Sequence, residues 1–306
     1  MRAVKTFLLK HPGLLLLLGK AYGLTRGVRL QRRADGAWVV SRGSQEVWLA
    51  PAHAAYARDV IREFDYYFTS VTPEQRDGKS VVDCTAPRMQ VLEGLADPIL
   101  ITGLPEPNAT NLLYAQLLDL PTGGVVIDAG AYCGASSLLF AQQVGSTGKV
   151  IAVEADPANY RALSENTASN PTITCVPAAL WSSRGTLVFA SEGNMGSAVQ
   201  PDGGEVRPGA SRVEVPALTA GDLVERFGLT RLDGIKLDIE GAEYAVLPAV
   251  GEIVAQFRPR IVFELHAAPE AQKAALTDVL LGYGYRVQKV KQSENEGAPL
   301  MLAVPD

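Results

Sequence analysis

The segment from Val125 to Ser137 constrains the fold of this chain more than any other. An apolar, β-branched run ends at a carboxylate, Asp128, and is followed by a turn of small residues and the start of a helix. Twenty residues past Gly134, a second apolar run ends at another acid, Glu154. Open α/β sheets bind ligands at the carboxyl ends of their strands. Two neighbouring parallel strands that each end in an acid therefore predict a nucleoside pocket.

The residues of the turn decide which nucleoside ligand fits. A dinucleotide site needs G-x-G-x-x-G, so that a pyrophosphate can lie against the helix N-terminus. Tyr132 and Ala135 occupy the second and third glycine positions, and Asp128 would repel a pyrophosphate. S-adenosylmethionine (SAM), which carries an ammonium and a sulfonium but no phosphate, suits the same geometry. Glu154 is then expected to accept hydrogen bonds from the ribose hydroxyls, at about 1.5–3 kcal/mol each. The alternative is a strand and turn whose acid only caps the helix.

The distribution of charge disfavours one class of partner and leaves another open. The 306 residues carry a net charge of −5, yet residues 1–34 hold eight basic side chains and no acid, which leaves 20 basic and 33 acidic residues beyond them. An acidic body does not favour nucleic acid, which requires clustered Lys and Arg. The apolar run from Leu14 to Leu18 is far shorter than the roughly 20 residues of a spanning helix. This basic start is expected to pack on the protein or a second subunit, or to rest on an anionic membrane surface.

The three cysteines, Cys84, Cys133 and Cys175, have no C-x-x-C spacing. They indicate neither a disulfide framework nor a zinc site, so a reducing compartment is expected. The expected location is the cytoplasm, with the membrane surface as the alternative for the basic segment.

The chain is expected to divide into three parts. Residues 1–34 form the basic N-terminal segment, residues 35–108 a small α+β cap, and residues 109–306 the SAM-binding core. Within the cap, periodicity and turn residues predict a hairpin, an amphipathic helix and an irregular stretch, over 36–50, 52–69 and 72–108 respectively.

From residue 125 onward, strand and helix signals alternate, which is typical of a parallel sheet. A helix over 110–118 precedes them. The expected strands are 125–128, 149–154, 173–177, 233–238 and 260–265, and the expected helices are 135–144, 157–168, 219–227, 242–256 and 269–281. Two final strands without a helix between them, 285–290 and 300–304, predict an antiparallel last strand. Extra strands at 186–189 and 212–215 are expected in an insertion that carries a functional loop, 191–197.

A series of short motifs occurs in a fixed order between residues 105 and 290. They are Glu106-Pro107, Asp128-Ala129-Gly130-Ala131, Glu154-Ala155-Asp156-Pro157, Leu163, Asn166, Ala179-Leu180, Gly185, Ile235-Lys236-Leu237-Asp238-Ile239-Glu240-Gly241-Ala242-Glu243 and Val262-Phe263-Glu264-Leu265-His266. In this order and spacing they resemble the FkbM-type SAM-dependent methyltransferases. That family usually has Asn where Tyr132 stands and Pro where Ala155 stands. The resemblance implies a class I methyltransferase fold, which is a Rossmann-like, doubly wound α/β fold, and SAM as the cofactor.

Twelve residues are candidates for binding the cofactor, most of them at the ends of the first three core strands. The backbone of the turn from Gly130 to Gly134, the glycine turn, is expected to approach the methionine moiety of SAM, since glycine permits close contact. Asp128 is expected to take the ammonium, directly or through water, and the two serines after the turn either cap the helix or contact the carboxylate of the methionine moiety. Ala178 and Ala179, at the end of the third strand, leave room for adenine. The resemblance implies that Glu106 touches the cofactor from outside the sheet. The full set is Glu106, Asp128, Gly130, Ala131, Tyr132, Gly134, Ser136, Ser137, Glu154, Ala155, Ala178 and Ala179.

Four titratable residues end the next two core strands. Asp238 and Glu240 follow the fourth strand, and Glu264 and His266 follow the fifth. Residues two apart on a strand share a face, so each pair is expected to point toward one rim of the sheet and to offer a general base for a hydroxyl nucleophile. The alternative is that these groups only cap the following helices. Asp, Glu and His also ligate divalent cations, but the sequence offers no clear third oxygen ligand at fixed spacing, so no metal is expected.

Together these features predict methyl transfer from SAM to a hydroxyl of a small molecule, glycan or secondary metabolite by in-line displacement. Asn194 and Ser197 of the 191–197 loop are the candidate substrate contacts, and the loop and cap are expected to close over the acceptor. Two alternatives stay open: a methyltransferase that acts on protein or RNA, and a SAM-binding interaction module without catalysis. A homo-oligomer is a further open alternative.

Overall fold

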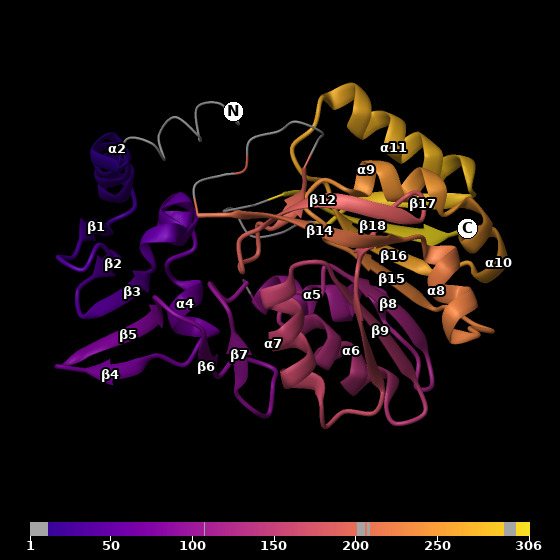
Figure 1. Cartoon of the computed structure of the whole chain (residues 1–306), viewed down its shortest axis with the longest axis horizontal. Helices are drawn as coiled ribbons and strands as arrows, with labels where there is room; N and C mark the ends of the chain where they lie inside the picture. The colour runs from indigo at the N-terminus through magenta and orange to yellow at the C-terminus, as the bar shows by residue number, and fades with distance from the viewer. Residues whose placement is uncertain (1–11, 107, 201–205, 207–208, 291–297) are drawn as a thin grey trace.

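The structure is a computed structural model that describes residues 12–106, 108–200, 206, 209–290 and 298–306. The basic residues Arg2, Lys5 and Lys10 of the N-terminal segment lie outside the described residues. Figure 1 shows two units side by side, an N-terminal unit built on a small sheet at the left and an α/β core at the right.

The core is a seven-stranded sheet in the order β10-β9-β8-β15-β16-β18-β17. β18 is the strand that runs antiparallel to its neighbours, β16 and β17. The predicted doubly wound sheet with an antiparallel last strand is therefore confirmed. The strands are β8 (Val125–Ala129), β9 (Lys149–Glu154), β10 (Ile173–Pro177), β15 (Gly234–Leu237), β16 (Arg260–Glu264), β17 (Tyr285–Lys289) and β18 (Leu300–Pro305).

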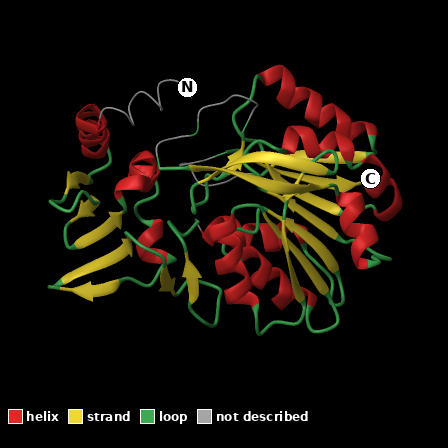
Figure 2. Ribbon diagram, in the orientation of Figure 1, coloured by secondary structure: helices red, strands yellow, loops and turns green. Residues whose placement is uncertain are grey.

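Helices cover both faces of this sheet (Figure 2). Successive side chains of a strand point to opposite faces, so Val126 packs in one apolar cluster with Phe140, whereas Ile127 packs in another with Leu223. One face is covered by α5 (Asn108–Leu118), α6 (Ala135–Val144) and α7 (Pro157–Thr167), and the other by α8 (Ala220–Phe227), α10 (Gly251–Phe257) and α11 (Glu270–Gly282).

The prediction of a single helix over 242–256 is wrong, because the segment is divided into three parts. The chain forms α9 (Glu243–Val246), a 3-10 turn η2 (Leu247–Ala249) and then α10. Pro248 lies in the turn, and proline has no N–H to continue the helical bonding and clashes with the preceding turn.

The N-terminal unit begins with α2 (Pro12–Thr25), which is followed by a five-stranded sheet in the order β1-β2-β3-β5-β4. Its strands are β1 (Arg29–Arg32), β2 (Trp38–Arg42), β3 (Gln45–Leu49), β4 (Glu74–Arg76) and β5 (Lys79–Cys84). β2 and β3 are the expected hairpin. Because β1 pairs with β2, no structural boundary lies at residue 34, and the end of the basic segment belongs to the sheet.

Two expectations for the N-terminal unit are wrong. The helix over 52–69 is divided into η1 (Pro51–Tyr56), α3 (Ala57–Arg62) and α4 (Tyr66–Thr69). The stretch 72–108 is not irregular, since it contains β4, β5, β6 (Arg88–Gln90) and β7 (Ile99–Ile101). Short strands of three to six residues depend on partners elsewhere in the chain, and a local pattern does not reveal those partners.

The insertion after β10 forms a small sheet of its own, in the order β11-β14-β12-β13. The two extra strands that were expected there are confirmed and are longer than expected. The strands are β11 (Ala179–Leu180), β12 (Gly185–Ser191), β13 (Ala198–Val199) and β14 (Ser211–Leu218).

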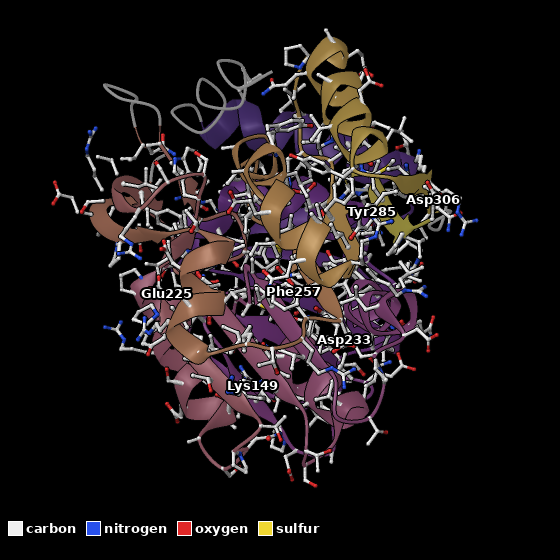
Figure 3. The ribbon with its side chains drawn as sticks, turned by 90° about the vertical axis from the view of Figure 1, so that its right-hand side faces the viewer. Lys149, Glu225, Asp233, Phe257, Tyr285 and Asp306 are labelled. Carbon is white, nitrogen blue, oxygen red and sulfur yellow. The ribbon has the colours of Figure 1, made fainter. Side chains whose placement is uncertain are left out.

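The carboxyl ends of the parallel strands point toward the N-terminal unit. Figure 3 views the core from the opposite side, where Lys149 at the start of β9 and Asp233 just before β15 are labelled. The loops at the carboxyl ends join the apolar core of the N-terminal unit, since Tyr132 packs in one cluster with Tyr56 and Leu104. The N-terminal unit therefore covers the edge of the sheet at which α/β proteins bind ligands.

Candidate functional site

A cavity lies at the carboxyl ends of β8, β9, β10 and β15. The cavity opens to solvent, and the space between its walls, counted to the opening, is about 520 Å³. Its walls are Glu106, Gly130, Tyr132, Val153, Glu154, Ala155, Asn159, Ala178, Ala179, Leu180, Phe189, Met195, Ser197, Val199, Asp238, Ile239, Glu240 and Ala242. Seven of the twelve candidate cofactor residues, among them Ala155, Ala178 and Ala179, thus lie together on one cavity.

Glu154 is held rigidly at this wall by the backbone around it. One carboxylate oxygen accepts the N–H of Tyr132 at 2.9 Å and the other accepts the N–H of Asp156 at 2.8 Å. Burial raises the pKa of Glu154 to about 7, although both N–H groups act in the opposite direction. A carboxylate oxygen has room for more than one donor, so Glu154 can still accept from a ligand hydroxyl.

Gly130 is required by a close approach of two turns. Its φ is +75°, and a Cβ at this position would lie 1.7 Å from the carbonyl oxygen of Asp238. The turn after β8 therefore passes directly against the turn after β15, and only glycine permits that contact.

Tyr132 joins the same turn to the N-terminal unit. Its φ is +50°, a conformation that Asn adopts more readily than Tyr. The hydroxyl donates to the carbonyl of Leu104 at 3.0 Å and accepts the N–H of Gly103 at 3.2 Å. Tyr132 thus places the segment before α5 over the cavity.

Glu106, which the resemblance implied as a cofactor contact from outside the sheet, lies on the cavity wall. Its carbonyl accepts a hydrogen bond from the hydroxyl of Tyr66. Burial, with the nearby charge of Asp238, raises the pKa of the Glu106 carboxyl well above its usual value.

Asp128 does not face the cavity, and the prediction that it takes the cofactor ammonium is wrong. Its carboxylate is fully buried, and one oxygen accepts the hydroxyls of Ser136 and Ser137 at 2.7 and 2.6 Å. The other oxygen lies 3.4 Å from the ammonium of Lys236. The ammonium beside Asp128 is therefore the protein's own, and the two serines contact Asp128 rather than a ligand.

Lys236 links the glycine turn to the acidic residues after β15. The side chain is fully buried, donates to the carbonyl of Gly130 at 2.7 Å and lies 3.9 Å from a carboxylate oxygen of Asp238. Burial alone would lower its pKa, but the charges of Asp128 and Asp238 outweigh burial and raise it. Sequence reasoning quoted Lys236 within a motif and gave it no role.

Ala131 and Gly134 also lie away from the cavity walls. Ala131 is buried in the cluster between the sheet and α6. A Cβ on Gly134 would lie 2.9 Å from Cδ1 of Leu163, so this glycine serves the packing of α7 against the turn. These two residues pack inside the protein, so the prediction that they contact the cofactor is wrong.

The four predicted catalytic residues do come together. Nε2 of His266 lies 3.8 Å from Asp238, 3.6 Å from Glu240 and 3.8 Å from Glu264, measured to one oxygen of each. Asp238 and Glu240 line the cavity, whereas Glu264 and His266 stand behind them. We call these four residues the acid–imidazole group.

Glu243, which sequence reasoning did not select, organises this group. One of its oxygens accepts the N–H of Ile239 at 2.8 Å and lies 3.1 Å from Nδ1 of His266. The other accepts the N–H of Gly241 at 2.9 Å. These bonds fix the turn in which Glu240 has a φ of +54°. They also direct Nε2 of His266 toward the carboxylates.

Tyr114 of α5 closes the group from the other side. Its buried hydroxyl lies 2.7 Å from an oxygen of Glu264 and 3.2 Å from an oxygen of Asp238, so it donates to one of them at a time. The sequence analysis predicted this helix and gave its tyrosine no role.

The group holds protons near neutral pH. Burial, with the charge of Asp238, raises the pKa of Glu264 to about 8, and burial also raises the pKa of Asp238. Burial would lower the pKa of His266, but the charges of Glu240 and Glu243 outweigh it and hold that pKa well above its usual value. A carboxyl whose pKa lies near 8, as that of Glu264 does, suits proton transfer at physiological pH.

Three members of the group also have the arrangement of a cation site. Ligand atoms of Asp238, Glu264 and His266 all lie within 4.8 Å of one another. Their chemistry, two oxygens and one imidazole nitrogen, is compatible with a divalent cation.

The two candidate substrate residues differ in position. Asn194 is fully buried, and its side-chain oxygen accepts the N–H of Leu104 at 3.0 Å. Its predicted substrate contact is wrong, because the side chain holds the 191–197 loop to the segment before α5. Ser197 lines the cavity and donates to a carboxylate oxygen of Asp156 at 2.7 Å.

Comparison with known proteins identifies relatives of this chain. Residues 128–287, just over half of the chain, match the methyltransferase FkbM domain. Methyltransferase sdnD of Sordaria araneosa is 31% identical over 167 residues, which are 45% of this chain and 64% of that protein. The chain therefore spans less than two thirds of the length of this curated relative.

Two solved structures are similar at low identity. Methyltransferase FkbM from Methylobacillus flagellatus KT has 14% identity and a TM-score of 0.42, with 60% of this chain and 44% of that chain covered. Aeropyrum pernix fibrillarin, whose crystal structure contains bound SAM, has 13% identity and a TM-score of 0.44, with 90% and 98% covered.

The cavity fits the adenosyl donor that the sequence predicted. Gly130 lets the turn after β8 lie against the turn after β15 at the cavity wall, Glu154 presents a carboxylate, and the alanines after β10 leave space for a ring. The predicted fold class and the cofactor, SAM, are confirmed together with the family. The chain belongs to the FkbM methyltransferase family.

Proposed function

We propose that this chain transfers a methyl group from SAM to a hydroxyl of a small molecule, glycan or secondary metabolite. The observation that carries the proposal is the acid–imidazole group, two of whose members line the cavity while the other two stand behind them. A hydroxyl must lose its proton as it attacks, and such a group can receive that proton. When bound, the cofactor supplies an electrophilic methyl group on a sulfonium.

The proposed cofactor contacts follow from the cavity walls. Glu154 would accept from the ribose hydroxyls, and Ala178 and Ala179 would lie against adenine. The backbone at Gly130 would approach the methionine moiety. Lys236 holds that backbone from behind through the carbonyl of Gly130.

Asp238 is the proposed general base, because it lines the cavity and its partners stand behind it. The bound donor would supply the methyl group to the acceptor oxygen and leave with the electrons of its carbon–sulfur bond, and the Asp238 carboxylate would receive the hydroxyl proton. The products are a methyl ether and S-adenosylhomocysteine. His266, 3.8 Å from the same carboxylate, positions Asp238 and shares its charge.

The acceptor is proposed to lie between Asp238 and Ser197, under the 191–197 loop. The hydroxyl of Tyr56 in the N-terminal unit donates to Glu192 of this loop at 2.6 Å. Contacts of this kind keep water out of the cavity, and the loop must open to admit an acceptor.

A labelled-methyl screen tests the proposed function. The full chain is incubated with SAM labelled on the methyl group and fractions of a metabolite and glycan extract, and labelled products are identified by mass spectrometry. We expect an O-methyl product whose formation slows by about 10²–10⁴-fold in Asp238→Asn, while calorimetry shows SAM binding retained. Label on protein or RNA, or SAM binding without any transfer, would overturn the proposal.

A further inference from the structure

The N-terminal helix α2 presents leucine side chains to solvent. Leu14, Leu17, Leu18 and Leu24 are 38%, 65%, 48% and 75% exposed. Among the described residues, these four are most of the exposed large apolar side chains, and the others are Met89, Val91 and Leu281. One short helix therefore carries four of the seven exposed large apolar side chains of the described residues. We call these four residues the leucine stripe.

The spacing of the leucine stripe places it along one side of the helix. Positions three, four and seven residues apart recur on the same helical face. The opposite side is packed, because Gly23 is buried and a Cβ on Gly19 would lie 2.4 Å from Cδ2 of Leu30 in β1. The helix is thus fixed to the sheet through its small residues, and the leucines point away. Figure 1 shows α2 at the outer end of the N-terminal unit, far from the core sheet.

The charge around the leucine stripe indicates the kind of partner. Residues 1–34 contain eight basic residues and no acidic residue, whereas the rest of the chain has an acidic excess. Lys20 lies on α2 itself, and Arg26, Arg29 and Arg32 follow in the next turn and in β1, all of them exposed. An apolar stripe beside basic side chains complements an anionic lipid surface.

A second copy of the chain suits this surface less well. A symmetric contact would bring the same patch of both subunits together, and the basic residues of the two copies would repel each other. A nucleic acid would satisfy the positive charge but would leave the leucine stripe without an apolar partner.

We propose that α2 binds the surface of a negatively charged lipid bilayer, with the leucine stripe inserted among the lipids and the basic residues over their headgroups. This inference is independent of the proposed methyl transfer. No helix among the residues that the structure describes is long and apolar enough to cross a membrane, so the contact is peripheral.

Vesicle flotation of the full chain tests the proposal. Vesicles of phosphatidylcholine alone are compared with vesicles in which about one third of the lipid is phosphatidylserine. We expect binding to the anionic vesicles to exceed binding to the neutral ones by at least tenfold, and to fall as salt is added. The double variant Leu17→Ser/Leu24→Ser is expected to lose at least tenfold in binding. Leu281→Ser, which changes a leucine that is 52% exposed on α11, is the matched control and is expected to bind as the parent does.

The outcomes separate the proposal from its rivals. The stripe residues are exposed, so the serine variants are expected to keep the parent melting temperature, and Lys20→Gln with Arg29→Gln gives a second route to weaker, less salt-dependent binding. Equal binding to both kinds of vesicle, or none, would overturn the proposal. Concentration-dependent dimerisation that the double leucine variant abolishes would overturn it in favour of a second copy of the chain.

Discussion

Glu243→Gln tests whether one buried carboxylate holds the acid–imidazole group together. Glu243 is fully buried and serves three donors, which are the N–H groups of Ile239 and Gly241 and the imidazole of His266. A glutamine of the same shape has one oxygen and one NH₂ group. In either orientation of the amide, its NH₂ group faces the backbone N–H of Ile239 or that of Gly241. That N–H group then has no acceptor.

The magnitude follows from the bonds lost. A buried N–H left without an acceptor costs about 1–3 kcal/mol, and each kcal/mol lowers the melting temperature by roughly 2–4 °C in a chain of this size class. Loss of the charged acceptor beside His266 removes about 1.5–3 kcal/mol of positioning. If that loss appears fully in the transition state, kcat falls by about 10- to 100-fold.

The pH profile of kcat separates this role from a merely structural one. Burial raises the pKa of Asp238, and the charge of Glu243 raises it further. For His266, burial acts to lower the pKa and the charges of Glu240 and Glu243 outweigh it. Removing the charge of Glu243 therefore lowers both pKa values, and the acid limb of the profile moves to lower pH.

The control for Glu243→Gln is Glu252→Gln, which removes the same charge from an exposed position in α10. We expect its kcat, pH profile and melting temperature to match those of the parent. An unchanged acid limb and unchanged kcat in Glu243→Gln would refute the reasoning, as would a change in KM alone.

Three further predictions concern the same site. Gly130→Ala is expected to abolish SAM binding in calorimetry, because its Cβ would lie 1.7 Å from the carbonyl oxygen of Asp238. The control is Gly185→Ala, whose Cβ would have nothing within 4 Å and which should bind SAM normally. Full-strength binding by Gly130→Ala would contradict the account. Burial raises the pKa of Glu264 from 4.5 to about 8. The free energy that protonated Glu264 contributes to folding is therefore complete below pH 4.5, the unfolded pKa, and is lost as the pH rises through about 8, the folded pKa. In Glu264→Gln the melting temperature should fall less between these pH values than in the parent, and an equal fall would argue against the assignment. EDTA is expected to leave turnover unchanged, because His266 and Tyr114 already contact the carboxylates; turnover that is lost and then restored by Mg²⁺ would show a metal site.

The fold of the core was predictable because its elements are long and their signals are local. The runs that became β8 and β9 are rich in β-branched residues and end in an acid. α7 begins after the capping residue Asp156 with Pro157, and α8 begins after the capping residue Thr219. The N-terminal unit was not predictable to the same degree. Its short strands become regular only through pairing, as when β3 pairs in parallel with β5 across η1, α3 and α4.

The site was predictable in its location and only partly in its roles. The sequence places acids at strand ends, but it does not show which of them meet a cation within the protein. Asp128 was assigned to a ligand because its partner, Lys236, lies more than a hundred residues away on the neighbouring strand. Tyr114 and Glu243 act through contacts with other elements, and the only local signal for Glu243 was its place at the end of a motif.

A crystal structure of the chain with bound SAM is the most direct test of the account. We predict the adenosyl group in the cavity at the ends of β8, β9 and β10, with the ribose hydroxyls on the Glu154 carboxylate and adenine beside Ala178 and Ala179. Density for the donor at any other place, or none in this cavity at saturating donor, would contradict the assignment of the site.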